Sequence, residues 1–256
     1  MLVILFTASV VYLLTQALSV NQLILPCLGA KMSQDTVNQV DQWMDTHSQL
    51  WGKMLAHPFL EEMRRGEIGE DVFNRWLRQD YIFVEAAIPF VGALIARCPE
   101  PEMRKVLGNI PGALEKELQL FRERATHLGV DVGDVQPGFI NHAYVQYLMA
   151  VGHQASFEEG MVVYWAAEKA YHESWKKVAP AIEQGHPWRP FVENWAGDEF
   201  GQLVNYLEGA VERLADDASP STRARMESQF EMVIRYELAF WEMAYRGPRW
   251  PGDDNE

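Results

Sequence analysis

Three acidic residues, Asp80, Glu168 and Glu237, stand at positions where the spacing of a helix calls for apolar side chains. Each interrupts a stripe of apolar residues that recur three or four positions apart. The stripe around Asp80 contains Phe73, Trp76 and Val84, that around Glu168 contains Met161, Tyr164, Tyr171 and Trp175, and that around Glu237 contains Phe230, Ile234 and Trp241. This spacing puts each carboxylate on the buried face of its helix. Burying a carboxylate costs free energy unless it is paired or hydrogen-bonded, and its pKa then usually shifts. Three of them predict a polar pocket inside a helical protein, as in an enzyme acting on small molecules.

A structural alternative exists for each carboxylate, because a buried acid can also be one half of an ion pair. The nearest cations in the sequence are Arg75 and Arg78 for Asp80, Lys169 for Glu168, and Arg235 for Glu237. Residues one or two positions apart on a helix point to different faces, which weakens the pair of Glu168 with Lys169 and that of Glu237 with Arg235. If two of the carboxylates converge in an apolar pocket, their pKa values can be pushed apart for general acid and base catalysis. Which glutamate would be the acid and which the base stays open.

The elements that must position these residues are helices, since apolar residues recur at helical spacing from Met32 onward. We expect helices over 37–55, 71–97 with a kink at Pro89, 114–128 ended by Gly129, 140–151 after Pro137-Gly138, 157–178, 191–195, 200–214, and a last long helix from Ser219-Pro220-Ser221 to about Gly247. No segment alternates like a strand. The connections are short, so the fold class predicted is all-α, a single-domain helical bundle.

Composition and charge narrow the class of protein. The net charge of −14 works against nucleic-acid binding, in which Lys and Arg neutralise phosphates. The two cysteines, Cys27 and Cys98, form no paired motif, which fits a reducing compartment and predicts a cytoplasmic protein. The histidines lack metal-ligand spacing, and none follows His186. Nucleotide-binding glycine loops are absent, so neither a metal nor a cofactor is predicted.

Residues 1–31 differ from the rest of the chain. They are largely apolar but lack the basic start of a signal peptide, and Gln16, Asn21 and Gln22 interrupt the stretch that a membrane span would need. We interpret 1–31 as a gene-model extension or, alternatively, as an anchor. A membrane partner is expected only if this segment is translated. Residues 32–250 would form the helical domain, and 251–256 a disordered tail.

Four short motifs occur in an order and spacing that resemble the TenA / thiaminase II family. They are His57-Pro58-Phe59, Gln79-Asp80-Tyr81, Trp195-Ala196-Gly197-Asp198 and Tyr236-Glu237-x-x-Phe240-Trp241-x-Met243, within a match from about Trp43 to Tyr245. The resemblance implies a haem-oxygenase-like fold, a homo-oligomer (dimer or tetramer), and chemistry on thiamin-derived aminopyrimidines. It implies that Asp80 holds the pyrimidine amino group, that Glu237 is catalytic, and that Tyr171 lines the pocket.

The chain departs from the family's usual pattern at three places. Phe83 and Trp195 stand where tyrosines are frequent, and the helix 157–178 has no cysteine where the best-known members carry a nucleophilic one. The pattern from Tyr164 through Glu168 to Tyr171 resembles the cysteine-lacking, glutamate-type branch. That branch implies a hydrolase of thiamin salvage, which converts formylaminomethyl- and aminomethyl-pyrimidines to the hydroxymethyl compound.

The predicted site therefore contains two catalytic residues and six that contact the substrate. Glu168 and Glu237 are the predicted acid and base, and the substrate-binding residues are Asp80, Phe83, Tyr164, Tyr171, Trp195 and Trp241. Two other functions remain open. A di-metal oxidase of the same fold would need several His and Glu ligands, and a binding or regulatory protein would hold the pyrimidine without turnover.

Overall fold

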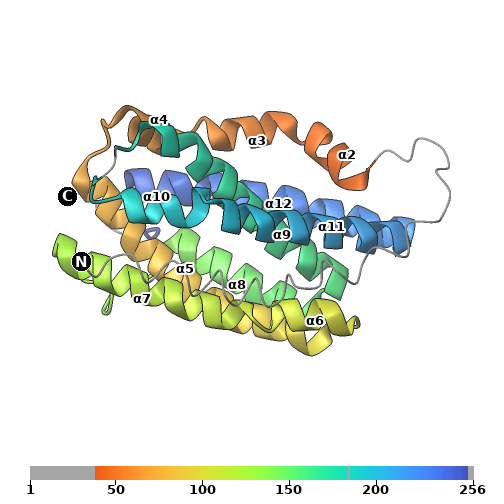
Figure 1. The fold of residues 1–256 in the computed structure, drawn as a ribbon. Coiled ribbons are helices and arrows are strands. Elements are labelled where there is room, and N and C mark those ends of the chain that lie inside the picture. The colour runs from red at the N-terminus through yellow and green to blue at the C-terminus, as the bar shows by residue number, and fades with distance from the viewer. Residues whose placement is uncertain (1–37, 184, 253–256) are drawn as a thin grey trace. The chain divides into compact units, whose positions relative to one another are not determined.

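The computed structural model describes residues 38–183 and 185–252, and these residues form helices and connecting turns without a strand (Figure 1). The predicted segment 1–31 and most of the predicted tail 251–256 lie outside the described residues. The helices are α2 (Gln39–Thr46), α3 (Ser48–Leu55), α4 (Pro58–Arg65), α5 (Glu70–Arg97), α6 (Pro101–Leu107), α7 (Ile110–Leu128), α8 (Phe139–Gln154), α9 (Phe157–Val178), the 3-10 turn η2 (Ala179–Ala181), α10 (Arg189–Ala196), α11 (Asp198–Asp217) and α12 (Pro220–Arg246).

Most of these helices confirm the sequence prediction. Helix α9 has the predicted bounds, and α7 ends at Gly129, whose φ of 67° is the left-handed conformation favoured by glycine. The single helix predicted over 37–55 is wrong, because α2 ends at Thr46 and α3 begins at Ser48, with His47 between them. Helices α4 and α6 were not predicted. Pro89 is exposed, and α5 continues through it from Glu70 to Arg97.

Helix α9 is the central element of the bundle. It packs against α12, α11, α10, α4, α5 and α8, and 14 of its 22 residues are buried. Gly160 allows α5 to approach, since a Cβ at this position would lie 2.5 Å from Leu94 Cδ2. A helix that is covered on most sides can hold a polar residue away from bulk water. Glu168 lies about three turns before the end of this helix.

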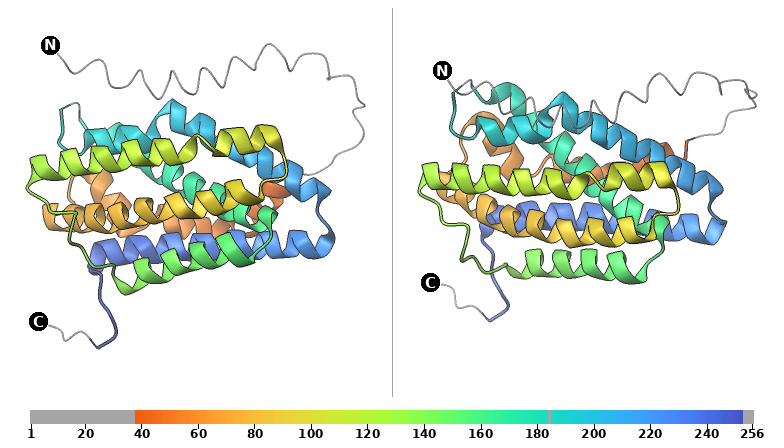
Figure 2. Two further views of the ribbon diagram at one scale, coloured as in Figure 1. Left: turned by 90° about the horizontal axis from the view of Figure 1, so that it is seen from below. Right: turned by 60° about the horizontal axis from the view of Figure 1, so that its bottom comes forward.

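Helices α5, α7, α8 and α12 run lengthwise beside one another (Figure 2). Helix α5 is the one helix of the described residues that is long and apolar enough to span a membrane by length and composition. Its buried residues, among them Phe73, Trp76 and Leu94, belong to the core that it shares with its neighbours. Asp80 lies in the middle of this apolar surface and is fully buried.

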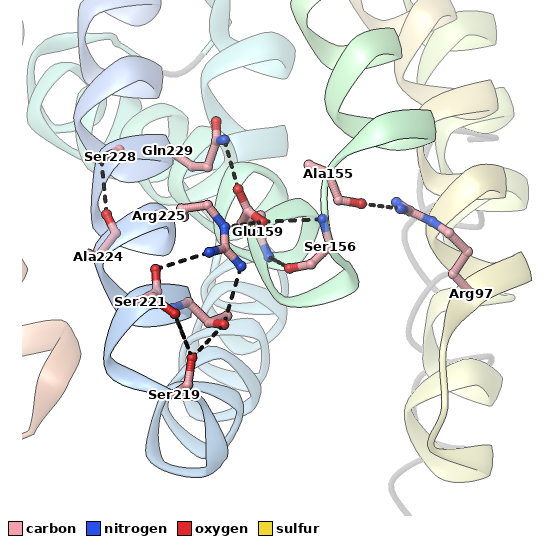
Figure 3. Close-up of polar contacts among 11 residues, drawn as sticks. Arg97, Ala155, Ser156, Glu159, Ser219, Ser221, Ala224, Arg225, Ser228 and Gln229 are labelled. Carbon is pink, nitrogen blue, oxygen red and sulfur yellow. Dashed lines mark hydrogen bonds and ion pairs between the residues drawn. The ribbon is translucent and has the colours of Figure 1, made fainter.

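A polar cluster fixes the corner between α8, α9 and α12 (Figure 3). Ser156 and Glu159 form a capping box at the start of α9. Arg225 of α12 makes an ion pair with Glu159 at 3.2 Å, and Gln229 donates to the other carboxylate oxygen at 3.3 Å. Gln229 in turn accepts a hydrogen bond from Tyr147 of α8. These contacts hold the three helices that supply one side of the acidic pocket.

Candidate active site

The three carboxylates predicted from the sequence come together, although they belong to α5, α9 and α12. Asp80 is fully buried, Glu237 is 1% exposed and Glu168 is half-buried. Their charges act on one another, since Glu237 and Glu168 both raise the pKa of Asp80, and Glu237 raises that of Glu168. Such coupling requires a short separation in a poorly screened interior. The structure therefore contains the acidic region that the helical spacing predicted.

Asp80 is held by a short chain of hydrogen bonds. The Trp76 indole Nε1 donates to the Tyr171 hydroxyl at 3.2 Å, and this hydroxyl donates to Asp80 Oδ1. Asp80 Oδ2 is buried and has no hydrogen-bond partner in the structure. Burial raises the pKa of Asp80 well above its usual range, although the Tyr171 hydrogen bond acts in the opposite direction. One oxygen is thus positioned by the protein, and the other can accept a donor from a ligand.

The ion-pair alternatives are wrong for the cations nearest in sequence, because those cations bind elsewhere. Arg75 donates to the carbonyls of Ala244 and Tyr245, Arg78 to the carbonyl of Asp131, Lys169 binds Glu173 and Glu208, and Arg235 binds Glu231. No salt bridge within the described part of the chain includes Asp80, Glu168 or Glu237. Residues 38–183 and 185–252 thus supply no cation that pairs with these three carboxylates, which favours a ligand with positive charge.

Glu237 is paired with a tyrosine that the sequence analysis missed. The Tyr144 hydroxyl of α8 donates to Glu237 Oε1 at 2.7 Å, whereas Oε2 is buried without a partner. Burial raises the pKa of Glu237 to about 8, and the Tyr144 hydrogen bond opposes that rise. Tyr144 lies in the helix predicted over 140–151, and its hydroxyl gave no separate signal in the sequence.

Glu168 is surrounded by acidic and aromatic groups. Its pKa is raised to about 8, mainly by burial and also by the charges of Glu117 and Glu237, whereas a hydrogen bond with Tyr164 acts in the opposite direction. Glu168 keeps some accessible surface, unlike Asp80 and Glu237. It can therefore meet water or a ligand while still being poorly solvated.

Glu117 of α7 is a fourth carboxylate in this region, and the sequence analysis missed it. Its Oε2 accepts a hydrogen bond from Asn194 Nδ2 at 3.2 Å, and the Trp195 side chain makes a second one. Burial raises its pKa to about 7. The signal was present, because Glu117 lies three residues after Leu114 and four before Phe121 on the apolar stripe of its helix.

The predicted aromatic residues line this region from two sides. The Tyr171 ring stacks on Trp241 at 5.4 Å and meets Trp195 edge-on at 5.6 Å. Phe83 lies on the Glu237 side, with its ring 4.7 Å from that of Tyr144. Flat apolar faces beside carboxylates suit a planar heterocycle that carries amino groups.

Two other kinds of chemistry find little support among these residues. Within 38–183 and 185–252, no group of three or more His, Cys, Asp or Glu side chains has an arrangement suited to a metal ion. Cys98, the free cysteine of the described part, follows the last residue of α5. At 1.5 Å per residue it lies about 27 Å from Asp80 along the helix. Burial raises the pKa of its thiol, which disfavours the reactive thiolate.

The fold and the site together define an all-α protein with a buried cluster of carboxylates among aromatic side chains, to which the described residues contribute no balancing cation. A model of the TENA/THI-4/PQQC family matches residues 44–247, and the chain belongs to this family. It is 28% identical over 225 residues to a Glycine max protein named "Probable bifunctional TENA-E protein", covering 84% of this chain and 96% of that one. It is 26% identical over 219 residues to the Helicobacter pylori "Aminopyrimidine aminohydrolase", covering 81% and 99%.

Solved structures agree with this assignment. A TenA homologue from Pyrococcus furiosus superposes with a TM-score of 0.77 at 30% identity and covers 81% of this chain and 100% of its own. A domain of unknown function from Shewanella denitrificans, described as having a heme oxygenase-like fold, gives a TM-score of 0.68 at 9% identity, covering 82% and 94%. The predicted haem-oxygenase-like helical bundle is thereby confirmed.

Proposed function

We propose that this protein is a hydrolase of thiamin salvage that converts formylaminomethyl- and aminomethyl-pyrimidines to the hydroxymethyl compound. The observation that carries the proposal is a buried group of carboxylates without a balancing cation, in which Asp80 Oδ2 and Glu237 Oε2 have no partner. Relatives from Helicobacter pylori, Halalkalibacterium halodurans and Bacillus subtilis that bear the name aminopyrimidine aminohydrolase support it, at 24–26% identity over most of the chain.

Asp80 would bind the ring of the substrate. An aminopyrimidine presents an exocyclic amine beside a ring nitrogen, and a carboxylate accepts hydrogen bonds from such a group more strongly than a neutral acceptor does. Tyr171 holds Oδ1 and leaves Oδ2 free for this contact. The stacked rings of Tyr171 and Trp241, with Phe83 opposite, would enclose the flat heterocycle.

Glu237 is the better candidate for the general base. Its hydrogen bond from Tyr144 stabilises the carboxylate form, and its second oxygen is free to accept a proton from water. Glu168 is the better candidate for the general acid, because the negative charges of Glu117 and Glu237 favour its protonated form. Both groups have a pKa of about 8 in the substrate-free protein, which suits proton transfer near neutral pH.

Water, rather than a protein thiol, would attack the substrate. Helix α9 contains no cysteine, and Cys98 is buried at the end of α5 with a thiol whose pKa is raised. We also propose that the protein acts in the cytoplasm, as its cysteine usage predicts, and as a homo-oligomer, as the sequence resemblance implies. Size-exclusion chromatography with light scattering tests the second point.

The products formed from three substrates test the proposed function. The full chain is incubated with the formylaminomethyl-pyrimidine, the aminomethyl-pyrimidine or thiamin, and the products are identified by mass spectrometry. Hydroxymethyl-pyrimidine from the first two, with thiamin cleaved poorly, is the expected result. Efficient thiamin cleavage would contradict the glutamate-type assignment. Tight pyrimidine binding without turnover would instead identify a binding or regulatory protein.

A further inference from the structure

Glu117 is a fourth carboxylate of the site, and the acid–base scheme proposed above does not place it in contact with the substrate. It is half-buried, and its two hydrogen-bond donors, Asn194 and Trp195, are neutral. No ion pair in the described part of the chain includes it. When Glu117 ionises, no side chain there neutralises its charge. The two donors orient the carboxylate and leave its capacity for a cation unused.

Glu117 belongs to the same cluster as the other three carboxylates. Its neighbour Trp195 contacts the Tyr171 ring at 5.6 Å, and Tyr171 binds Asp80. The charge of Glu117 also acts on Asp80 and Glu168, raising the pKa of both. Independently of these charges, Asp80 Oδ2 and Glu237 Oε2 are fully buried polar atoms without partners. A ligand that supplies hydrogen-bond donors and positive charge would satisfy the whole group.

We propose that Glu117 binds the ammonium group of the aminomethyl-pyrimidine and thereby favours this substrate over the formylaminomethyl compound. The inference rests on the proposed function and identifies the charge state that the site selects. An alkyl ammonium group offers three donors and a full positive charge, whereas the nitrogen of a formamide is neutral with a single N–H. Only the first can balance the charge that Asn194 and Trp195 leave on Glu117.

The two reactions differ at the bond that breaks. With the amine, the methylene–nitrogen bond breaks and a water oxygen bonds to the methylene carbon, so that R–CH2–NH3+ and H2O give R–CH2–OH and NH4+. With the formamide, the carbonyl–nitrogen bond breaks, and water gives formate and the aminomethyl-pyrimidine as its ammonium ion. In the first reaction Glu117 would contact the leaving nitrogen as a charged ammonium group, and in the second the leaving nitrogen is a neutral amide. Substituting Glu117 should therefore affect the two reactions to different extents.

The substitution Glu117→Gln tests this idea, because glutamine keeps the volume and an acceptor oxygen for Asn194 while removing the charge. In the full chain, KM for the aminomethyl-pyrimidine should rise roughly ten- to a hundredfold, the range expected for a lost charge-assisted contact. The rise in KM for the formylaminomethyl compound should be smaller than this by a factor of about ten or more. Glu117→Asp keeps the charge and should retain most of the preference. Glu115→Gln, an exposed change on the same helix, is the matched control.

Binding measurements separate this inference from the proposed function. By calorimetry, the wild-type chain should bind the aminomethyl-pyrimidine more tightly than the neutral hydroxymethyl compound, and Glu117→Gln should remove the difference. If neither substrate is turned over but this difference holds, the proposed function fails and the ammonium site stands. Equal binding of the two compounds by the wild-type chain, or equal kinetic losses on both substrates in Glu117→Gln, would overturn the inference.

Discussion

Replacing Tyr144 with phenylalanine should lower the ionised fraction of Glu237 at neutral pH without disturbing the packing around it. The Tyr144 hydroxyl donates to Glu237 Oε1 at 2.7 Å, while its ring contacts Phe83 and stacks on Tyr236 at 4.6 Å. Phenylalanine keeps the ring and removes only the donor. The hydrogen bond stabilises the carboxylate, so its loss must raise the pKa of Glu237 further.

The size of this effect follows from the energy of the lost bond. A hydrogen bond to a charged group contributes about 1.5–3 kcal/mol, and one pH unit of pKa corresponds to about 1.4 kcal/mol. The pKa of Glu237, about 8 in the wild-type protein, should therefore rise by about one to two pH units. At neutral pH, the ionised fraction and kcat/KM should fall roughly ten- to a hundredfold.

The assay is the pH dependence of kcat/KM for the aminomethyl-pyrimidine, which reports ionisations of the free enzyme. The acidic limb of the profile should move to higher pH in Tyr144→Phe, and activity should recover as the pH rises. Tyr147→Phe is the matched control, since that hydroxyl, on the same helix, binds Gln229 and not Glu237. An unshifted acidic limb with uniformly reduced activity would refute a base role for Glu237.

Three further predictions concern stability and binding. Burial raises the pKa of Glu117 from 4.5 to about 7 and those of Glu168 and Glu237 from 4.5 to about 8. The folded state therefore binds more protons than the unfolded state between these values, and the stability that these groups contribute at low pH is lost as the pH rises from 4.5 to about 8. The melting temperature of the substrate-free protein should fall over this range, less steeply in Glu237→Gln, and an identical slope would contradict the assignment. Asn141→Ala should lower the free energy of unfolding by about 1–3 kcal/mol, since the buried Asn141 Nδ2 donates to Gln79 O at 2.8 Å and to Gln79 Oε1 at 3.0 Å; denaturant titration checks this against the exposed change Asn205→Ala. Asp80→Asn should mainly raise KM and Glu237→Gln mainly lower kcat, and near-normal kinetics in both would place the pocket elsewhere.

The helical period explains how much of the site could be predicted. Asp80, Glu168 and Glu237 each interrupt an apolar stripe, and the period of a helix alone puts them on a buried face. Periodicity does not determine which helices are neighbours, so the meeting of α5, α9 and α12 became visible only in the structure. The family resemblance supplied the fold and the expected roles of Asp80 and Glu237.

The residues that were missed have physical reasons of their own. Tyr144 counts as apolar in a stripe, yet its hydroxyl is the donor that holds Glu237. Glu117 lies on the apolar stripe between Leu114 and Phe121, and it was missed although this position marks it as strongly as the other three carboxylates. The break at His47 was missed because the apolar stripe continues across it, whereas helix ends depend on local backbone hydrogen bonds.

The central claim is that carboxylates, and not a cysteine, carry out the hydrolysis. Its most direct test compares the rate of hydroxymethyl-pyrimidine formation from the aminomethyl-pyrimidine in two variants of the full chain. A variant with Cys27→Ser and Cys98→Ser should keep the wild-type rate, whereas Glu237→Gln should lose about a hundredfold or more, the scale of general base catalysis. Loss of turnover in the cysteine-free variant, with activity retained in Glu237→Gln, would contradict the claim.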